Sequence, residues 1–415
     1  MSGMRFLPPL FLGLSLCSTA HSVLAQTRLT DMLQAAANTH PSVLQARSQY
    51  ESAGYDVETA KWGRFPTITS QALAPNNRTQ SVTRVEQPLW TGGRITGQIQ
   101  LSESNQRAAL SSVLDAQTNA MVQVSNAYFD FLRMQLRLVV ALENVKEHQK
   151  LADLIGRRVK SEVSPMADDV LANARLQQAI TERIQIQKAM EAARLTLEQW
   201  TGLNVTRVNP PKQLEFRRTA SDEALIQKTF DFSGQRNRLL HLADSAQYQL
   251  DVVKAQALPS VVAGYQHLWG GLVPSSYQHN SAYVSLQFQP GAGLSAISNR
   301  NAAAMKQDAA KQELLALERN LRNQVLSTLA DIDSAESQLK PAQTLLAGTT
   351  EVVASYLRQY QVGRRIWIEV LNAQREMTQA AYGLIDLQVS LQQSQAKLML
   401  LSGDITPQEY GLIHE

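Results

Sequence analysis

The chain has 415 residues but a single cysteine, Cys17, which excludes an internal disulfide and a metal site built from several thiolates. Glycine and proline are also scarce, at 20 and 14 residues, so few positions force a helix to end. The charges nearly cancel, with 39 basic and 36 acidic side chains, and this balance argues against a nucleic-acid partner. The composition therefore indicates long regular elements without covalent cross-links.

The motifs of catalytic and metal centres are missing as well. The seven histidines include no pair at the spacing of helical metal ligands, and neither H-E-x-x-H nor G-x-S-x-G occurs. The stretch GAGLSA (291–296) matches the dinucleotide turn G-x-G-x-x-A. No strand with an acidic end follows it at the required distance, because Asp308 falls inside a helical pattern. We therefore expect no enzymatic activity, no cofactor and no metal ion.

The first 25 residues have the pattern of a signal peptide. Arg5 gives a positive start, a short apolar run ends at Cys17, and Val23 to Ala25 provides a cleavage site. A lipid anchor on this cysteine is disfavoured because Leu16, a large residue, precedes it. Beyond this segment, no apolar run reaches the roughly 18 to 20 residues of a membrane-spanning helix. We expect an exported protein without such a helix.

Two parts of the chain repeat each other, half a chain apart. Val170, Leu171 and Arg175 in the stretch VLANAR have counterparts in EVLNAQRE, in the last helical segment. Earlier in each half, a helical stretch starts at a helix breaker and stops at a proline, over 41–66 and 234–259. Two segments with strand character, a glycine pair and long helices follow. We interpret this pattern as a duplication with the order helix, strand, strand, helix, helix.

The duplication predicts the organisation of the whole chain. We expect a signal peptide at 1–25, a first structural repeat at 26–202, a linker at 203–220, a second structural repeat at 221–403 and a C-terminal tail at 404–415.

The helices after the glycine pairs are predicted to be unusually long. Residues 94–161 contain no proline, and as one helix they would span about 100 Å at roughly 1.5 Å per residue. In the last helix, apolar residues from Val370 to Leu398 follow alternating steps of three and four, the period of a coiled coil. Pro341 interrupts the pattern of the helix over 293–361 and predicts a kink or a break that the first repeat lacks.

The strand segments suggest contact with a membrane. In SAYVSLQFQ (281–289), apolar residues alternate with polar ones, as in strands that separate lipid from water. Segments 67–74 and 81–90 alternate poorly, which leaves ordinary sheet strands as an alternative. Only four strands are predicted, whereas a closed outer-membrane barrel needs at least about eight. If these strands enter a membrane, several chains must contribute to one barrel.

Residues 40–67, the stretch EQPLWTGGRITG (86–97) and the two repeated helices resemble the outer-membrane factor family typified by TolC. The resemblance implies a mainly α-helical homotrimer in the bacterial outer membrane, in contact with its lipid. Three chains would form one twelve-stranded β-barrel and a long periplasmic α-helical barrel. It also implies two partners, a periplasmic adaptor protein and an inner-membrane transporter.

The function implied is an outer-membrane channel-tunnel of a tripartite export system. The blocks AKWGRFP and EQPLWTGGR resemble the branch that serves type I secretion of large proteins such as adhesins. One alternative is the outer-membrane component of a small-molecule or drug efflux pump. A periplasmic coiled-coil adaptor fits less well, because this chain has two similar halves in place of one hairpin.

The same resemblance implies a closed tunnel tip. Family channels are narrowed by acidic residues of the last helix and held shut by links from that segment to neighbouring helices. The matching positions are Glu369 and Asn372 for the pore constriction, and Asp168, Asp169, Tyr360 and Arg365 for the gate links, with Arg365 bonded to one of the two aspartates. The alternative is a surface pair between Arg365 and Glu369, one helical turn apart.

Overall fold

The computed structural model describes residues 28–73, 80–211, 221–269, 279–289, 291–293 and 295–406. The predicted signal peptide, residues 212–220 of the predicted linker and residues 407–415 of the predicted tail lie outside them. The elements are α1 (Leu29–Thr39), α2 (Pro41–Trp62), β1 (Thr67–Leu73), β2 (Gln80–Trp90), α3 (Arg94–Lys160), α4 (Met166–Thr201), α5 (Asp222–Phe232), α6 (Gly234–Gln256), β3 (Ser260–Trp269), β4 (Asn280–Gln287), α7 (Ser295–Gln361) and α8 (Trp367–Ser402).

The same succession of elements occurs twice. α3 and α7 both have 67 residues, α4 and α8 both have 36, and α1 and α5 both have 11. Glycines with positive φ occupy corresponding places, with Gly92 and Gly93 before α3 and Gly291 and Gly293 before α7. Such backbone angles favour glycine, so the scarce glycines mark the ends of the long helices in both repeats.

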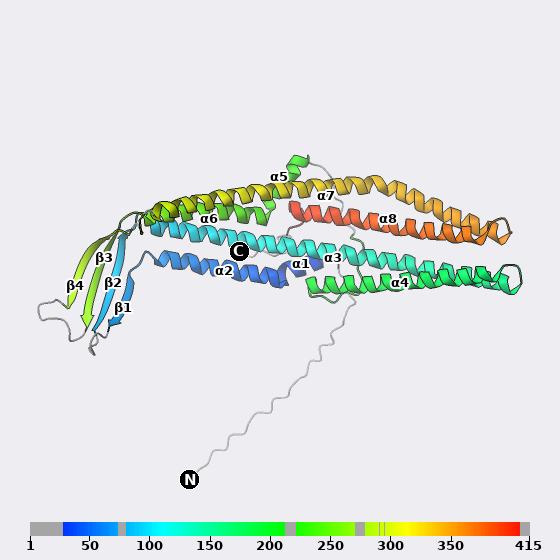
Figure 1. The fold of residues 1–415 in the computed structure, drawn as a ribbon, viewed down its shortest axis with the longest axis horizontal. Coiled ribbons are helices and arrows are strands. Elements are labelled where there is room, and N and C mark those ends of the chain that lie inside the picture. The colour runs from blue at the N-terminus through cyan, green and yellow to red at the C-terminus, as the bar shows by residue number, and fades with distance from the viewer. Residues whose placement is uncertain are drawn as a thin grey trace, which may run out of the picture.

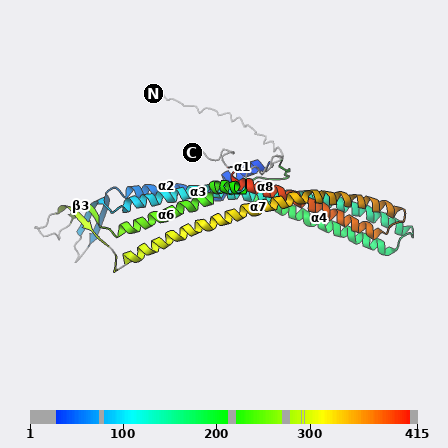
Figure 2. The same cartoon turned by 90° about the horizontal axis from the view of Figure 1, so that it is seen from above.

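The molecule is a long rod (Figure 1). The sheet lies at one end, and the turns that connect α3 to α4 and α7 to α8 lie at the other end, the tip. Near the sheet the helices lie in the order α2, α3, α6, α7, and toward the far end in the order α4, α3, α8, α7, each in contact with the next. Seen from above, they form a thin, bent layer (Figure 2). Such a layer has the shape of a wall segment.

α7 runs without a break from Ser295 to Gln361, although Pro341 lies inside it. Of the two predicted outcomes, a kink or a break, the break does not occur. The ribbon of α7 changes direction in its second half, toward the turn that leads to α8 (Figure 1). A proline removes one backbone hydrogen bond and crowds the preceding turn, so it bends a helix that packing holds together.

The four strands form one antiparallel sheet in the order β1-β2-β3-β4. Glu86 of β2 faces Gly264 of β3, which in turn faces Tyr283 of β4. The Tyr283 ring lies across Gly264, where a Cβ atom would stand only 2.3 Å from the ring carbon Cζ. Its hydroxyl donates a hydrogen bond to the Glu86 carboxylate at 2.6 Å, which fixes the register of three strands.

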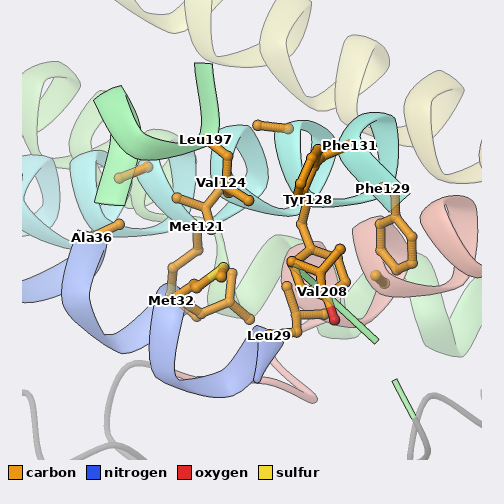
Figure 3. Close-up of a cluster of buried hydrophobic side chains, with 14 of the residues drawn as sticks. Leu29, Met32, Ala36, Met121, Val124, Tyr128, Phe129, Phe131, Leu197 and Val208 are labelled. Atoms are coloured by element: carbon orange, nitrogen blue, oxygen red, sulfur yellow. The ribbon is translucent and has the colours of Figure 1, made fainter. Parts of the chain in front are cut away.

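The largest hydrophobic core lies midway along the rod, where both repeats meet (Figure 3). It joins α1, α3 and the last turns of α4 and α8 to residues 203–211, at the start of the predicted linker. Val205 and Val208 are fully buried, and Gln135 of α3 exchanges hydrogen bonds with the backbone of Val208 at 2.9 and 3.2 Å. The chain therefore leaves the first repeat through a fixed, packed segment.

Candidate functional site: the helical tip and the sheet

The turns between α3 and α4 and between α7 and α8 lie side by side at the far end of the rod (Figure 1). A hydrophobic cluster joins these four helix ends, and Tyr360 and Trp367 belong to it. Tyr360 is only 6% exposed, and the guanidinium of Arg158 lies 4.9 Å from the centre of its ring. Tyr360, one of the predicted gate residues, is thus packed between the two repeats.

Arg365 lies in the turn just before α8 and has three partners, one in α8 and two in α7. Its Nη1 donates to the Glu369 carboxylate at 2.8 Å, and its Nε donates to the side-chain oxygen of Gln359 at 3.2 Å. Its guanidinium also lies 4.2 Å from the centre of the Tyr356 ring, a cation–π contact. Both members of the ion pair are about one-third exposed, which limits the contribution of the pair to stability to roughly 0 to 1 kcal/mol.

The two predicted acceptors are held elsewhere in the protomer. Asp168 and Asp169 lie in the first turn of α4, and a Cβ atom at Gly156 of α3 would stand 3.2 Å from Asp169 Oδ1. Among the described residues, the ion pair of Arg365 is with Glu369 and not with either aspartate. Within one protomer, Arg365 therefore forms the alternative ion pair, with Glu369 four residues along the chain. A contact across to a neighbouring protomer stays a prediction.

Glu369 and Asn372, the predicted constriction residues, lie in the first two turns of α8. Glu369 is half-buried beside Arg365, whereas Asn372 is exposed and lines a small cavity between α3, α4 and α8. The sequence interpretation missed Tyr356 and Arg158, which supply the cation–π contacts of the tip. The sequence pattern that could have indicated these contacts is the spacing of Tyr356 and Tyr360. Residues four apart lie on the same face of a helix, one turn from each other.

Large apolar side chains are exposed at both turns of the tip. Val163 and Met166 at the first turn and Val362 and Ile366 at the second are each 61 to 69% exposed. Isolated exposed apolar residues are common, but a group at the end of a rod indicates a surface that another molecule covers.

The sheet at the other end has two chemically different faces. One face carries Ile68 at 71% exposure and Val284 and Leu286 at 70% each. The opposite face carries the pair Tyr283–Glu86 and a hydrogen bond from Arg84 Nε to Gln266 Oε1 at 3.4 Å. The alternation of apolar and polar residues that was expected for the last strand therefore extends over the sheet. Val85 of β2, for example, lies on the apolar face beside Ile68 and Tyr265.

Two further observations concern the described residues. They contain no helix that is both long and apolar enough to cross a membrane. Within this part of the chain, no three side chains of histidine, cysteine, aspartate or glutamate come together in a way that could hold a metal ion.

A wall of long paired helices that ends in a small antiparallel sheet with one apolar, exposed face is the architecture of an outer-membrane channel protomer. The model of the outer membrane efflux protein family matches residues 32–203 and 239–404, most of the chain. The chain therefore belongs to the outer membrane efflux protein family. It is an outer-membrane export channel whose helical part extends into the periplasm.

Solved structures share this fold. A membrane protein from Pseudomonas aeruginosa has a TM-score of 0.80 at 16% identity, over 90% of each chain. The Campylobacter jejuni CmeC outer membrane channel has a TM-score of 0.75 at 14% identity, over 91% of this chain and 86% of its own. The open state of the Neisseria gonorrhoeae MtrE outer membrane channel has a TM-score of 0.73 at 14% identity, over 91% and 89%. CmeC and MtrE are outer membrane channels. A search of the curated proteins finds no match to this chain.

Proposed function

We propose that three copies of this chain form one channel-tunnel, and the observation that carries this proposal is the incomplete sheet. Among the described residues, β1 and β4 each have one partner strand, which leaves the other edge of each free there. An unpaired strand edge cannot face lipid, because each unsatisfied backbone group there costs several kcal/mol. Three chains would pair these edges in a barrel of twelve strands, with the apolar face against lipid and the polar face toward water.

The layer of helices supports the same assembly. α2 and α4 border one side of the wall and α7 the other. Outside the wall, the only described helices that contact these borders are the short α1, which contacts α2 and α4, and the short α5, which contacts α7. Three such walls would close into a periplasmic α-helical barrel that continues the β-barrel. The duplication makes this tube nearly sixfold, since each chain contributes two similar helix pairs.

We propose further that the tip binds a periplasmic adaptor, which connects the channel to an inner-membrane transporter. The exposed apolar residues of the two turns support this assignment because docking would remove them from water. In the resting state, Glu369 would form the narrowest charged ring. Arg365, from the segment before α8, would bond to Asp168 or Asp169 of a neighbouring protomer, and Tyr360 would provide a second gate link.

For the cargo, we propose type I secretion of large proteins, with small-molecule efflux as the second candidate. The blocks AKWGRFP (60–66) and EQPLWTGGR (86–94) support the first candidate, and membership in the efflux protein family favours the second. Deletion of the gene distinguishes them. We expect the mutant to lose high-mass proteins from the culture medium while its sensitivity to drugs stays unchanged. Unchanged secretion with increased drug sensitivity would contradict the secretion role.

The channel activity itself is tested with the purified protein in a planar lipid bilayer. We expect discrete conductance steps that share one unit size, since each assembled trimer forms one pore. Protein that is folded and inserted but gives no steps would contradict a conducting channel.

A further inference from the structure

A small, partly open cavity of about 70 Å³ lies behind the tip, at the point where α4 and α8 both meet α3. Two arginines line it, Arg175 from α4 and Arg375 from α8, which occupy equivalent places in the two repeats. The amides of Asn144, Gln178 and Gln379 line the cavity as well. The duplication thus places two arginines and several amide side chains around one small cavity.

The two arginines are not neutralised within the protomer. Arg175 Nη1 donates to the neutral side chain of Gln178 at 2.8 Å, and no ion pair among the described residues includes Arg175 or Arg375. The remaining basic group of the cavity is His148, which is 8% exposed. Burial, and next the charge of Arg175, hold the pKa of His148 below its usual value. Since both causes favour the neutral imidazole, His148 adds no positive charge of its own near neutral pH.

The only carboxylate among the lining residues, Glu182, lies next to Tyr382. Burial, and next the charge of Glu182, raise the pKa of the Tyr382 hydroxyl to about 12, so this side chain remains a neutral phenol beside the carboxylate. One carboxylate cannot offset two guanidinium groups. The cavity therefore has a net positive charge and a surplus of hydrogen-bond donors.

We propose that this cavity binds a small oxyanion of the phosphate or sulfate type, held by Arg175 and Arg375. A guanidinium group offers donors in a planar fork that matches the oxygens of such an anion. About 10 to 15 Å³ of such space holds one water molecule, so a cavity of about 70 Å³ has room for one small anion.

The bound anion joins the two repeats. α4 and α8 both pack on α3, and the anion bridges them by one arginine from each. Since α8 also carries Glu369 and Asn372, the anion stabilises the arrangement in which the start of α8 rests against the first repeat. A ligand stabilises the state that binds it. Once the ligand concentration exceeds the dissociation constant, this stabilisation grows with the logarithm of the concentration. The oxyanion therefore holds the tip in the conformation described here.

The test uses the full-length protein, extracted from membranes in detergent, with sodium phosphate as the probe. Isothermal titration calorimetry measures the dissociation constant, and thermal unfolding is compared in phosphate and chloride at equal ionic strength. We expect saturable phosphate binding and a higher unfolding temperature in phosphate. Arg375→Gln, at an exposed position, should weaken phosphate binding at least tenfold, whereas Arg319→Gln, an exposed arginine of α7 outside the cavity, should leave it unchanged.

Phosphate also stabilises proteins without binding to a site, because it is excluded from their surface. This general effect is the same in the Arg375→Gln and Arg319→Gln variants, so the difference between them reports the site alone. Equal binding in both variants, or equal binding of chloride and phosphate, would overturn the proposal. Arg375→Lys retains the charge but not the fork, and we expect intermediate binding. None of these measurements depends on pore activity, so the result stands apart from the proposed channel function.

Discussion

Arg365 in the turn before α8 and Tyr356 near the end of α7 show how single residues set the properties of the tip. The arginine is held by one carboxylate, one amide and one aromatic face, all from its own repeat. Its position could be predicted from the spacing of Arg365 and Glu369, since residues four apart on a helix are neighbours. The link to Asp168 or Asp169 could not be predicted in the same way, because it depends on the packing of separate helices or separate chains.

Replacement of Arg365 tests the role of this residue in the gate. Arg365→Ser removes the ion pair and the cation–π contact together, and we expect a higher single-channel conductance in a planar bilayer. Arg365→Lys keeps the charge and serves as the matched control with a smaller effect. Glu369→Ala should weaken block by multivalent cations, because the pore would lose a ring of negative charge. Conductance and cation block that both remain unchanged would show that Arg365 and Glu369 form a surface pair without a gating role.

His148 predicts a pH dependence of stability. Its pKa in the folded protein is below the ordinary value of 6.5, so below that pH the unfolded chain binds a proton that the folded chain does not. Stability is therefore lost as the pH falls below about 6.5. Burial, and next the charge of Arg175, lower this pKa. Glu182 from α4 and Arg375 and Tyr382 from α8 line the same cavity.

The measurement compares unfolding temperatures at about pH 7.5 and pH 5.5. We expect His148→Gln to lose less stability on acidification than the wild type. The matched comparison is His241→Gln in α6, since burial mainly lowers the pKa of His241 as well. It reports the same kind of titration at a site away from the tip. An identical loss in His148→Gln and the wild type would show that His148 does not titrate as described.

At the scale of elements, the sequence predicts the long helices better than the strands. The glycine pairs and the absence of proline over 94–161 define α3 closely, since few residues in that stretch can end a helix. α1 and α5 were missed, because 11 residues are too few for a helical period to stand out. The pairing of β2 with β3 joins the two repeats and depends on contacts far apart in the chain, which a local pattern does not contain.

Glycine substitutions test the packing of α6 on α3. A Cβ atom at Gly234 would stand 2.5 Å from the backbone nitrogen of Asp115 and 2.8 Å from the carbonyl oxygen of Ser111. Gly234→Ala must push α6 away from α3, and we expect it to lower the free energy of unfolding by about 1 to 3 kcal/mol. Gly348→Ala, inside α7 with no atom of the protomer near its Cβ, should stabilise the helix by up to about 1 kcal/mol.

Chemical denaturation of the two variants beside the wild type measures both effects. A Gly234→Ala protein as stable as the wild type would show that the close approach of α6 and α3 is not required. A destabilised Gly348→Ala protein would instead place a neighbouring chain against this side of α7.

At the scale of the whole molecule, the rod has surfaces that one chain leaves without partners. The sheet has two free edges and an apolar face, the wall of helices ends on both sides, and apolar residues are exposed at both turns of the tip. The sequence could predict the number of strands and hence the need for several chains. It could not specify how the helices of neighbouring chains meet, since those contacts lie outside any one chain.

The number of chains in the assembled protein tests the central claim most directly. Native mass spectrometry of the detergent-extracted outer-membrane protein gives this number, and circular dichroism of the same sample shows whether the strands are formed. We expect a single species of three chains that resists dissociation until it is heated, because each chain needs two neighbours to pair its outer strands. A stable monomer with its full strand content would contradict the account.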